Sequence, residues 1–388
     1  MRNHYFFSQP HQPFFLLAFI NAIISMFIFM LIFKGVIASE ISSRYYHAYS
    51  FIYMLFTPVF LAFLFTTFSK FSNTEPIAKK HYIQVLYLYV SGSILFQLGT
   101  FFSIGLLTIS ILLLFIAHLY STKLLLDIYN NSKINDKEDQ EWILIAMAIG
   151  LFTHFLFLIA LWASSLLTFS IQLSIYLYLF ILIFTIAQRM VPFFAHITIE
   201  KHRERLKVIV GLLALHVLLE VIQSHSSFLV DLLLGYLLGR EIWRWKLPFS
   251  QNNAMVWILI IALYWLPIIF ALSSITNFIT LINGSNFLFL DVHILVLGFF
   301  FTILIGFGTR VTIGHSGNTM EADKLTTVLF YWTQLVVLMR LLTSLAVANG
   351  WNFVVLFDLS ITTWIVLFSL WGSRFFPILI FGKKLDKK

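Results

Sequence analysis

The sequence contains no cysteine among its 388 residues. This absence excludes disulfides, thiolate metal sites, iron–sulfur clusters and haem attached through a C-x-x-C-H motif. The chain also lacks a P-loop, a G-x-S-x-G element and an H-E-x-x-H element, so common nucleotide-binding, hydrolase and zinc-protease signatures are missing. Any metal or haem chemistry must therefore use histidine, methionine or carboxylate side chains.

Charged residues are scarce, and two long stretches have none. Asp, Glu, Lys and Arg make up 11% of the chain, whereas hydrophobic residues make up 60%. No charged residue occurs between Lys80 and Lys123 or between Glu141 and Arg189. A helix needs about 20 apolar residues to cross the hydrocarbon core of a bilayer, and each stretch is long enough for two helices. The composition therefore predicts an all-α integral membrane protein whose partner is the lipid bilayer.

The apolar segments predict about twelve transmembrane helices. No segment between them is long enough to fold as a soluble domain, so we expect residues 1–388 to form a single polytopic membrane domain. The predicted spans are 14–33, 47–68, 83–104, 106–126, 142–163, 168–188, 207–223, 226–241, 254–274, 291–313, 325–347 and 352–372.

Lysine and arginine are divided unevenly between the two ends of these spans. With twelve spans, all but three of the 25 Lys and Arg residues lie on the side that holds both termini. Lys34 and Arg44 lie on the other side, and Arg340 lies within a span. Because positively charged loops stay in the cytoplasm, we predict cytoplasmic termini and a multi-pass membrane protein. The same loops account for the net charge of +8, which therefore indicates no nucleic-acid partner.

The segments 207–223 and 226–241 are short and hold Glu220 and Asp231. The polar turn at 223–227 suggests a break between them. One span over the whole region is the alternative, but it would move the positively charged loops that follow to the outer side. The charge pattern favours two spans.

Two histidines open predicted spans at the outer face. His47 opens the second span and His293 opens the tenth. Neutral imidazole is a strong ligand for haem iron, so two histidines at one depth could hold a haem, expected to be haem b, between them. The alternative is two unrelated interfacial histidines, and the spacing does not exclude it.

Two arginines lie where they could bind the propionates of such a haem. Arg340 is inside the eleventh span near its outer end, where a charge is costly and needs an anionic partner. That partner would be a propionate or Asp291, and the alternative is that Arg340 extends to the interface. Arg44, three residues before His47, would supply a second positive charge.

Further candidates lie along the tenth span and at its inner end. Gly298, Gly306 and Gly308 allow close approach by a neighbouring helix or by a flat cofactor, and helix packing is the commoner use. Arg310 and His315 end this span at the cytoplasmic face, and Arg189 ends the sixth span on the same face. We predict that Arg189, Arg310 and His315 form an inner cluster that holds an anion or locks the two helices.

Four segments of the chain together resemble the motifs of one family, the NnrS family. In the most specific of these family motifs, a histidine opens a Gly- and Thr-bearing helix that ends in T-R-V-x-x-G-H-[ST]-G. The segments are HILVLGFFFTILIGFGTRVTIGHSGN at 293–318, HQPFFLLAFINA at 11–22, HAYSFIYMLFTPVFLAFLFT at 47–66 and QRMVPFF at 188–194. The resemblance implies a haem- and copper-containing bacterial inner-membrane protein tied to nitric oxide handling and nitrosative stress.

The chain departs from the family pattern at residues that would bind metal. The motif that usually reads H-A-H-E is His47-Ala48-Tyr49-Ser50 here, and Ile260 stands where the family commonly has a histidine. His47, His293, Arg310 and His315 are retained. Copper is therefore expected below one ion per chain, with His216 and His225 as speculative replacement ligands.

Two functions follow from these patterns. The first is a haem-binding protein of nitric oxide metabolism or nitrosative stress tolerance, with a small gaseous or small-molecule ligand. The second is a twelve-helix secondary transporter of a small solute, a class with the same layout. The absence of a recognisable inverted repeat disfavours transport, while the choice among turnover, sensing and sequestration stays open.

Overall fold

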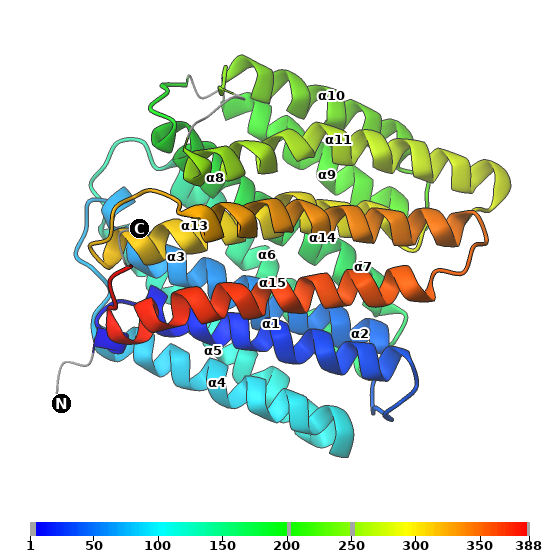
Figure 1. Ribbon diagram of the computed structural model, residues 1–388, viewed down its shortest axis with the longest axis horizontal. Coiled ribbons are helices and arrows are strands. Elements are labelled where there is room, and N and C mark those ends of the chain that lie inside the picture. Colours follow the sequence, from blue (N-terminus) through cyan, green and yellow to red (C-terminus); the bar gives the residue numbers. More distant parts are fainter. Residues whose placement is uncertain (1–4, 200–202, 249–252, 386–388) are drawn as a thin grey trace. The chain divides into compact units, whose positions relative to one another are not determined.

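The computed structural model describes residues 5–199, 203–248 and 253–385, and within these ranges the chain forms helices joined by loops, without strands (Figure 1). Within these ranges a short 3₁₀ turn, η1 (Tyr5–Phe7), precedes twelve long helical spans, which confirms the predicted number. Nine spans are single α-helices. They are α1 (His11–Phe33), α4 (Lys79–Phe102), α5 (Ile104–Asn131), α6 (Glu138–Ala160), α9 (Arg203–Ile222), α10 (Phe228–Arg244), α11 (Ala254–Asn283), α14 (Lys324–Ala348) and α15 (Val354–Phe381).

The other three spans each contain a π-helical segment. The second span comprises α2 (Ser43–Tyr49), η2 (Ser50–Phe56) and α3 (Thr57–Phe71). The sixth comprises α7 (Leu166–Leu173), η3 (Ser174–Leu179) and α8 (Phe180–Phe194). The tenth comprises α12 (Leu290–Ile294), η4 (Leu295–Phe301) and α13 (Thr302–His315). π-helical segments are rare overall, but they occur frequently at functional sites. Each of these three spans also carries candidate residues.

Ten of the twelve spans are long and apolar enough to cross a membrane, as counted over the described ranges. The remaining two are α9 and α10, with 20 and 17 residues. They are separate helices, as predicted, because the Glu220 carboxylate accepts the backbone N–H groups of His225 at 3.0 Å and Ser227 at 3.3 Å. His225 has a positive φ of 69°, and this reverses the chain between α9 and α10.

The chain forms two compact units. Unit 1 comprises Met1–Ser174, Gly308–Thr319 and Phe368–Lys388, and unit 2 comprises Ile175–Phe307 and Met320–Leu367. The expectation of a single membrane domain over 1–388 stays a prediction.

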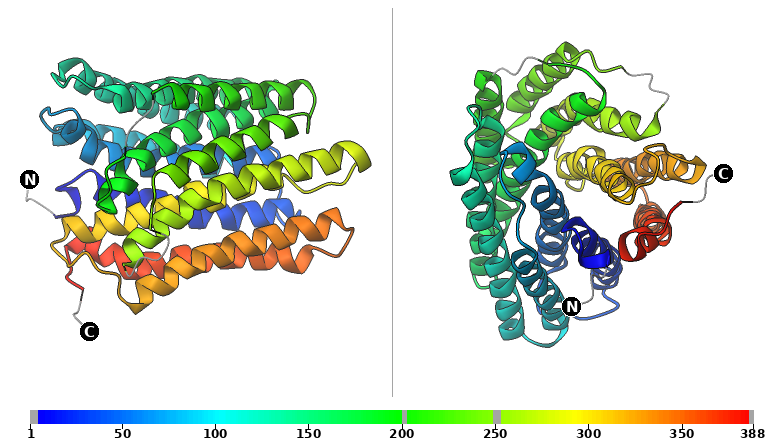
Figure 2. Two further views of the ribbon diagram at one scale, coloured as in Figure 1. Left: turned by 90° about the horizontal axis from the view of Figure 1, so that it is seen from above. Right: turned by 90° about the vertical axis from the view of Figure 1, so that its left-hand side faces the viewer.

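Glycine allows close helix packing inside each unit. In unit 1, α4 and α5 lie side by side (Figure 2), and a Cβ at Gly99 would come within 2.7 Å of the Leu107 backbone. In unit 2, α10 packs on α11, where Gly239 faces Pro267. Gly298 of η4 faces the Trp265 ring of α11 in the same way. These glycines therefore serve helix packing, the commoner of the two uses considered for the tenth span.

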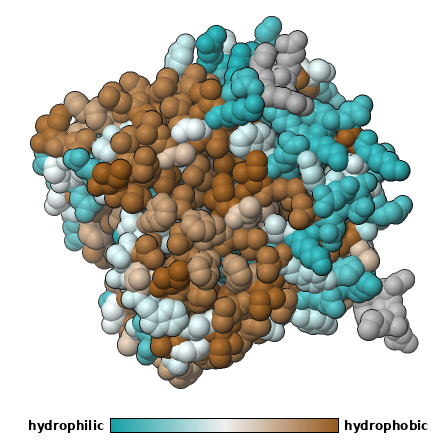
Figure 3. Space-filling view, turned by 180° about the vertical axis from the view of Figure 1, so that it is seen from behind, coloured by the Kyte–Doolittle hydropathy of each residue, from teal (hydrophilic) through white to brown (hydrophobic). Residues whose placement is uncertain are grey.

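Large apolar side chains lie on the surface of many helices. Figure 3 shows apolar side chains over much of one face. Examples are Phe102, Ile222, Tyr236 and Phe381, with exposed fractions of 72%, 72%, 62% and 75%. Exposed apolar surface of this extent suits contact with lipid, so the chain is a multi-pass membrane protein.

Candidate functional site

His293 lies in the five-residue helix α12, directly before the π-helical segment η4 of unit 2. Its side chain is half-buried, and its Nδ1 lies 2.8 Å from the Phe289 carbonyl oxygen. Nδ1 carries the proton when it donates to this carbonyl, so the lone pair is then on Nε2. A fixed Nδ1–H bond to a backbone carbonyl is the usual way in which a protein orients a metal-binding imidazole.

Arg340 of α14 approaches the same ring. Its Nη2 lies 3.0 Å from His293 Nδ1 and also donates to the Leu288 carbonyl, while Nη1 donates to Ser344 Oγ. His293 Nδ1 cannot donate to Phe289 and accept from Arg340 at once, so the two contacts belong to different tautomers. In the tautomer suited to ligation, Arg340 keeps Leu288 and Ser344 as acceptors.

Arg340 is only 7% exposed, so it does not extend to the interface. Its hydrogen-bond acceptors lie within unit 2, and the Asp291 carboxylate adds electrostatic attraction. Asp291, the partner predicted from the sequence, therefore attracts Arg340 electrostatically, whereas the hydrogen bonds of Arg340 go to other groups.

Two strained residues precede α12. Leu288 and Phe289 have φ values of 51° and 55°, a left-handed conformation that costs a bulky side chain free energy. The carbonyls of these two residues are the ones that contact Arg340 and His293. The strained turn thus aims two acceptors at the two candidate residues.

His47 lies in α2, three residues before the π-helical segment η2 of unit 1. Its half-buried ring packs against Phe29 and Phe51, with ring centroids 4.3 Å and 4.6 Å away. Arg44, one turn earlier on α2, is exposed. His47 and His293 belong to different units, and their predicted pairing on one haem stays a prediction.

The two histidine-bearing spans share a local design. In each, a threonine just after the π-helical segment donates to a carbonyl five residues earlier: Thr57 to Ile52 at 2.7 Å, and Thr302 to Leu297 at 2.9 Å. In η2, the Met54 carbonyl also accepts from Asn21 of α1 at 2.9 Å. These bonds satisfy backbone groups near each candidate histidine.

The predicted inner cluster is divided between the units. Arg310 and His315 belong to unit 1 and Arg189 to unit 2, so their proximity stays a prediction. Inside unit 1, the His315 ring packs against buried His11 with ring centroids 4.7 Å apart. Lys70 acts electrostatically on both rings. His11 and Lys70 are thus further members of the His315 surroundings that sequence reasoning did not select.

A buried aromatic cluster in unit 1 surrounds Tyr49, the residue that replaces the family's second histidine. The Tyr49 hydroxyl lies 2.7 Å from His154 Nε2, and the Tyr53 ring stacks on His154 at 3.9 Å. The His118 ring lies 5.8 Å from that of His154. His154 is therefore a hydrogen-bonded core histidine.

The described residues do not fit a copper site. Over 5–199, 203–248 and 253–385, no group of three or more His, Cys, Asp or Glu side chains is arranged to hold a metal ion. Of the speculative ligands in unit 2, His216 Nδ1 lies 2.6 Å from Asp231, and His225 Nδ1 lies 2.9 Å from Asn277. The copper content stays a prediction.

Comparison with known proteins identifies the family. No curated protein matches the chain. The family model described as NnrS protein matches residues 5–381, which is nearly the whole chain and includes both histidine-bearing spans. The chain therefore belongs to the NnrS family.

Proposed function

We propose that this chain is a haem-binding inner-membrane protein of nitric oxide metabolism or nitrosative stress tolerance. Its NnrS family membership supports the link to nitric oxide. The observation that carries the haem proposal is the 2.8 Å contact from His293 Nδ1 to the Phe289 carbonyl. That contact orients an imidazole for axial ligation.

Each candidate histidine has surroundings that support the haem proposal. His293 and His47 would bind the haem iron, and both are half-buried beside a π-helical segment. Arg340 and Arg44 would supply positive charge toward the propionates. A bound haem b would supply redox-active iron for a small gaseous ligand or for electron transfer.

The absorption spectrum and haem content of the detergent-purified full chain test this function. We expect a Soret band and stoichiometric haem b in wild type and in His81→Ala, a histidine control in α4. A colourless protein whose thermal stability increases with an added solute would contradict the proposal and support the transporter alternative.

Arg340→Leu adds a second arm to this test. It removes a cation beside His293, so we expect weaker haem retention during purification with unchanged iron ligation. Lys324→Leu, at the exposed start of the same helix, is the matched control.

A further inference from the structure

A groove lies between two helices of unit 2, where the first turns of α9 meet the last turns of α10. Its volume is about 250 Å³. Side chains of both helices line it, among them Arg205, Val208 and Ile209 of α9 and Leu237, Arg240 and Glu241 of α10. We name these residues the arginine groove. None of them is a candidate haem or metal ligand.

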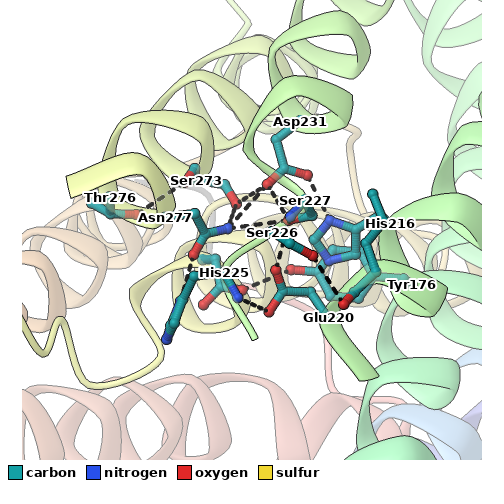
Figure 4. A network of polar contacts seen from close by, with 12 residues as sticks. Tyr176, His216, Glu220, His225, Ser226, Ser227, Asp231, Ser273, Thr276 and Asn277 are labelled. Atoms are coloured by element: carbon teal, nitrogen blue, oxygen red, sulfur yellow. Dashed lines mark hydrogen bonds and ion pairs between the residues drawn. The ribbon is translucent and has the colours of Figure 1, made fainter. Parts of the chain in front are cut away.

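A buried polar network joins α9, α10 and α11 beyond the groove (Figure 4). His216 Nδ1 of α9 lies 2.6 Å from Asp231 Oδ1 of α10. Ser273 Oγ and Asn277 Nδ2 of α11 donate to Asp231 Oδ2 at 2.8 Å and 3.1 Å. The Tyr176 ring of η3 packs on the His216 imidazole with centroids 4.1 Å apart. These contacts fix the helices against each other, so the groove between α9 and α10 is a stable feature of the fold.

Positive charge predominates at the groove end of this helix pair. Residues 204–210 and 237–246 contain five Lys and Arg side chains but only two Glu side chains. The buried Glu241 carboxylate accepts from Arg205 Nη1 and Arg244 Nη2, both at 2.5 Å, and from Trp245 Nε1 at 3.0 Å. Two guanidinium groups therefore share one carboxylate, which leaves a net positive charge beside the groove.

Arg240 adds a second positive charge to the groove itself. Its side chain is exposed and makes no ion pair within the described part of the chain. The other acid at this end, Glu204, is paired with Lys207 at 2.8 Å. Arg205 contacts Glu241 through Nη1 only, and a guanidinium has further N–H donors. Because Arg205 and Arg240 line one cavity, both can donate to the same phosphate, an anion that matches guanidinium geometry.

Apolar side chains continue from the groove along both helices. On α10, Leu233, Leu237 and Arg240 are spaced so that they share one helix face, and on α9 the same holds for Val208 and Leu215. Val208, Leu215 and Leu233 are exposed. The cationic groove therefore opens onto an apolar stripe, and acyl chains fit such a surface.

The length of α10 and the position of Trp243 bring the groove to the level of lipid headgroups. α10 has 17 residues, which corresponds to a rise of about 26 Å, whereas the hydrocarbon core is about 30 Å thick. So short a helix brings its charged end to the edge of the core, where lipid phosphates lie. The exposed Trp243 ring beside Arg244 is typical of a membrane interface. The predicted topology assigns this end to the cytoplasmic leaflet, which carries anionic lipids.

We propose that the arginine groove binds one anionic phospholipid of the cytoplasmic leaflet. Its phosphate lies between Arg205 and Arg240, and its acyl chains follow Val208 and Leu237 into the bilayer. A free anion would use the arginines but not the apolar stripe, whereas a phospholipid uses both. The bound lipid bridges α9 and α10 and so stabilises two helices that are short for membrane spans. The site functions in this way whether or not the chain holds haem.

Native mass spectrometry of the full chain, released from detergent micelles that contain phosphatidylglycerol or phosphatidylcholine, tests the proposal. We expect wild type to retain one phosphatidylglycerol and to prefer it over phosphatidylcholine. Arg240→Gln should bind phosphatidylglycerol about tenfold more weakly, because one charge-assisted contact is lost. Lys207→Gln is the matched control. It removes the same charge at the same end of the helix pair, and Lys207 is exposed and does not line the groove.

Two further arms distinguish a phospholipid from a free phosphate. Val208→Gln interrupts the apolar stripe and should weaken phosphatidylglycerol binding about fivefold. Val328→Gln in α14 is its control, because the two valines are 51% and 52% exposed and only Val208 lines the groove. Inorganic phosphate in large molar excess should leave the bound phosphatidylglycerol in place.

Three outcomes would overturn the proposal. Equal weakening in Arg240→Gln and Lys207→Gln would mean that lipid is attracted to the basic surface in general. Equal retention of phosphatidylcholine and phosphatidylglycerol would show that the groove does not select an anionic lipid. Displacement of the lipid by inorganic phosphate would identify a simple anion site. Because Arg240 is exposed and unpaired among the described residues, Arg240→Gln leaves the fold intact and the test valid.

Discussion

Single hydrogen bonds from Arg340 support the strained residues before α12. The guanidinium donates to the Leu288 carbonyl and to Ser344, and its Nη2 lies 3.0 Å from His293 Nδ1. Leu288 and Phe289 both have positive φ values. Because the surrounding contacts must offset the free energy of such a turn, Arg340 stabilises the turn as well as supplying charge.

Arg340→Leu should therefore destabilise the fold as well as weaken haem retention. We expect the free energy of unfolding to fall by about 3 kcal/mol, because hydrogen bonds from a charged donor are lost and buried acceptors are left unpaired. Arg340→Lys should recover part of this loss. Detergent-induced unfolding measures the effect, with Lys324→Leu as control, and equal stability of Arg340→Leu and wild type would refute the supporting role.

Tyr49 is the residue on which the predicted copper content depends. Its hydroxyl is bonded to His154, where the family commonly has a histidine. We expect substoichiometric copper in wild type after chelator washing, and a higher copper content in Tyr49→His, because imidazole is the better copper ligand. Metal analysis of both proteins, with Tyr331→His as control, decides this. One tightly held copper per wild-type chain would mean that other ligands have taken over.

At the scale of the elements, the turn between α9 and α10 depends on one side chain. Both are short for membrane spans, and the Glu220 carboxylate caps the turn between them. Glu220→Ala leaves two backbone N–H groups of that turn without their acceptor. We expect a loss of about 1–2 kcal/mol, as for other lost helix caps.

The Glu220 effect should appear as faster proteolytic cleavage within 223–227. Glu204→Ala is the control, because Glu204 lies in the same helix and its side chain is 82% exposed. Equal cleavage rates in the two variants would show that the turn does not depend on Glu220.

The element boundaries were largely predictable, whereas their internal geometry was not. A helix is present at each of the twelve predicted spans, because the length and apolarity of a segment can be read from the sequence, although α9 and α10 are short for membrane spans. The span predicted at 254–274 continues to Asn283, and its polar residues Ser273 and Asn277 donate hydrogen bonds to the Asp231 carboxylate. The π-helical segments could not be predicted, because their hydrogen-bond register depends on contacts such as Asn21 to Met54.

The candidate residues show the same division. His47 and His293 were selectable because each opens a span, and Glu220 and Asp231 were visible as charges in short spans. The contacts of Tyr176, Asp231 and His216 were not, because they join η3, α10 and α9 through tertiary packing. The left-handed Leu288 and Phe289 also have no sequence signal, since neither is glycine or asparagine.

For the whole molecule, the orientation in the membrane stays a prediction. The charge division among the loops predicts that both termini are cytoplasmic. A reporter fused to the C-terminus should be active only in its cytoplasmic form. Activity only on the outer side would require an odd number of spans, and the region of α9 and α10 would be the first to reconsider.

The central claim for the whole molecule is a haem held by His47 and His293. Two histidine ligands would give low-spin iron with little open coordination, suited to electron transfer more than to gas binding. Loss of either ligand would open a coordination position or empty the site.

The most direct measurement is the spin state and haem content of wild type, His47→Ala and His293→Ala, read from absorption and electron paramagnetic resonance spectra of the purified full chain. We predict low-spin haem in wild type and in the control His81→Ala. Each ligand variant should show high-spin haem or a loss of haem. A low-spin spectrum at full haem content in both His47→Ala and His293→Ala would contradict the assignment.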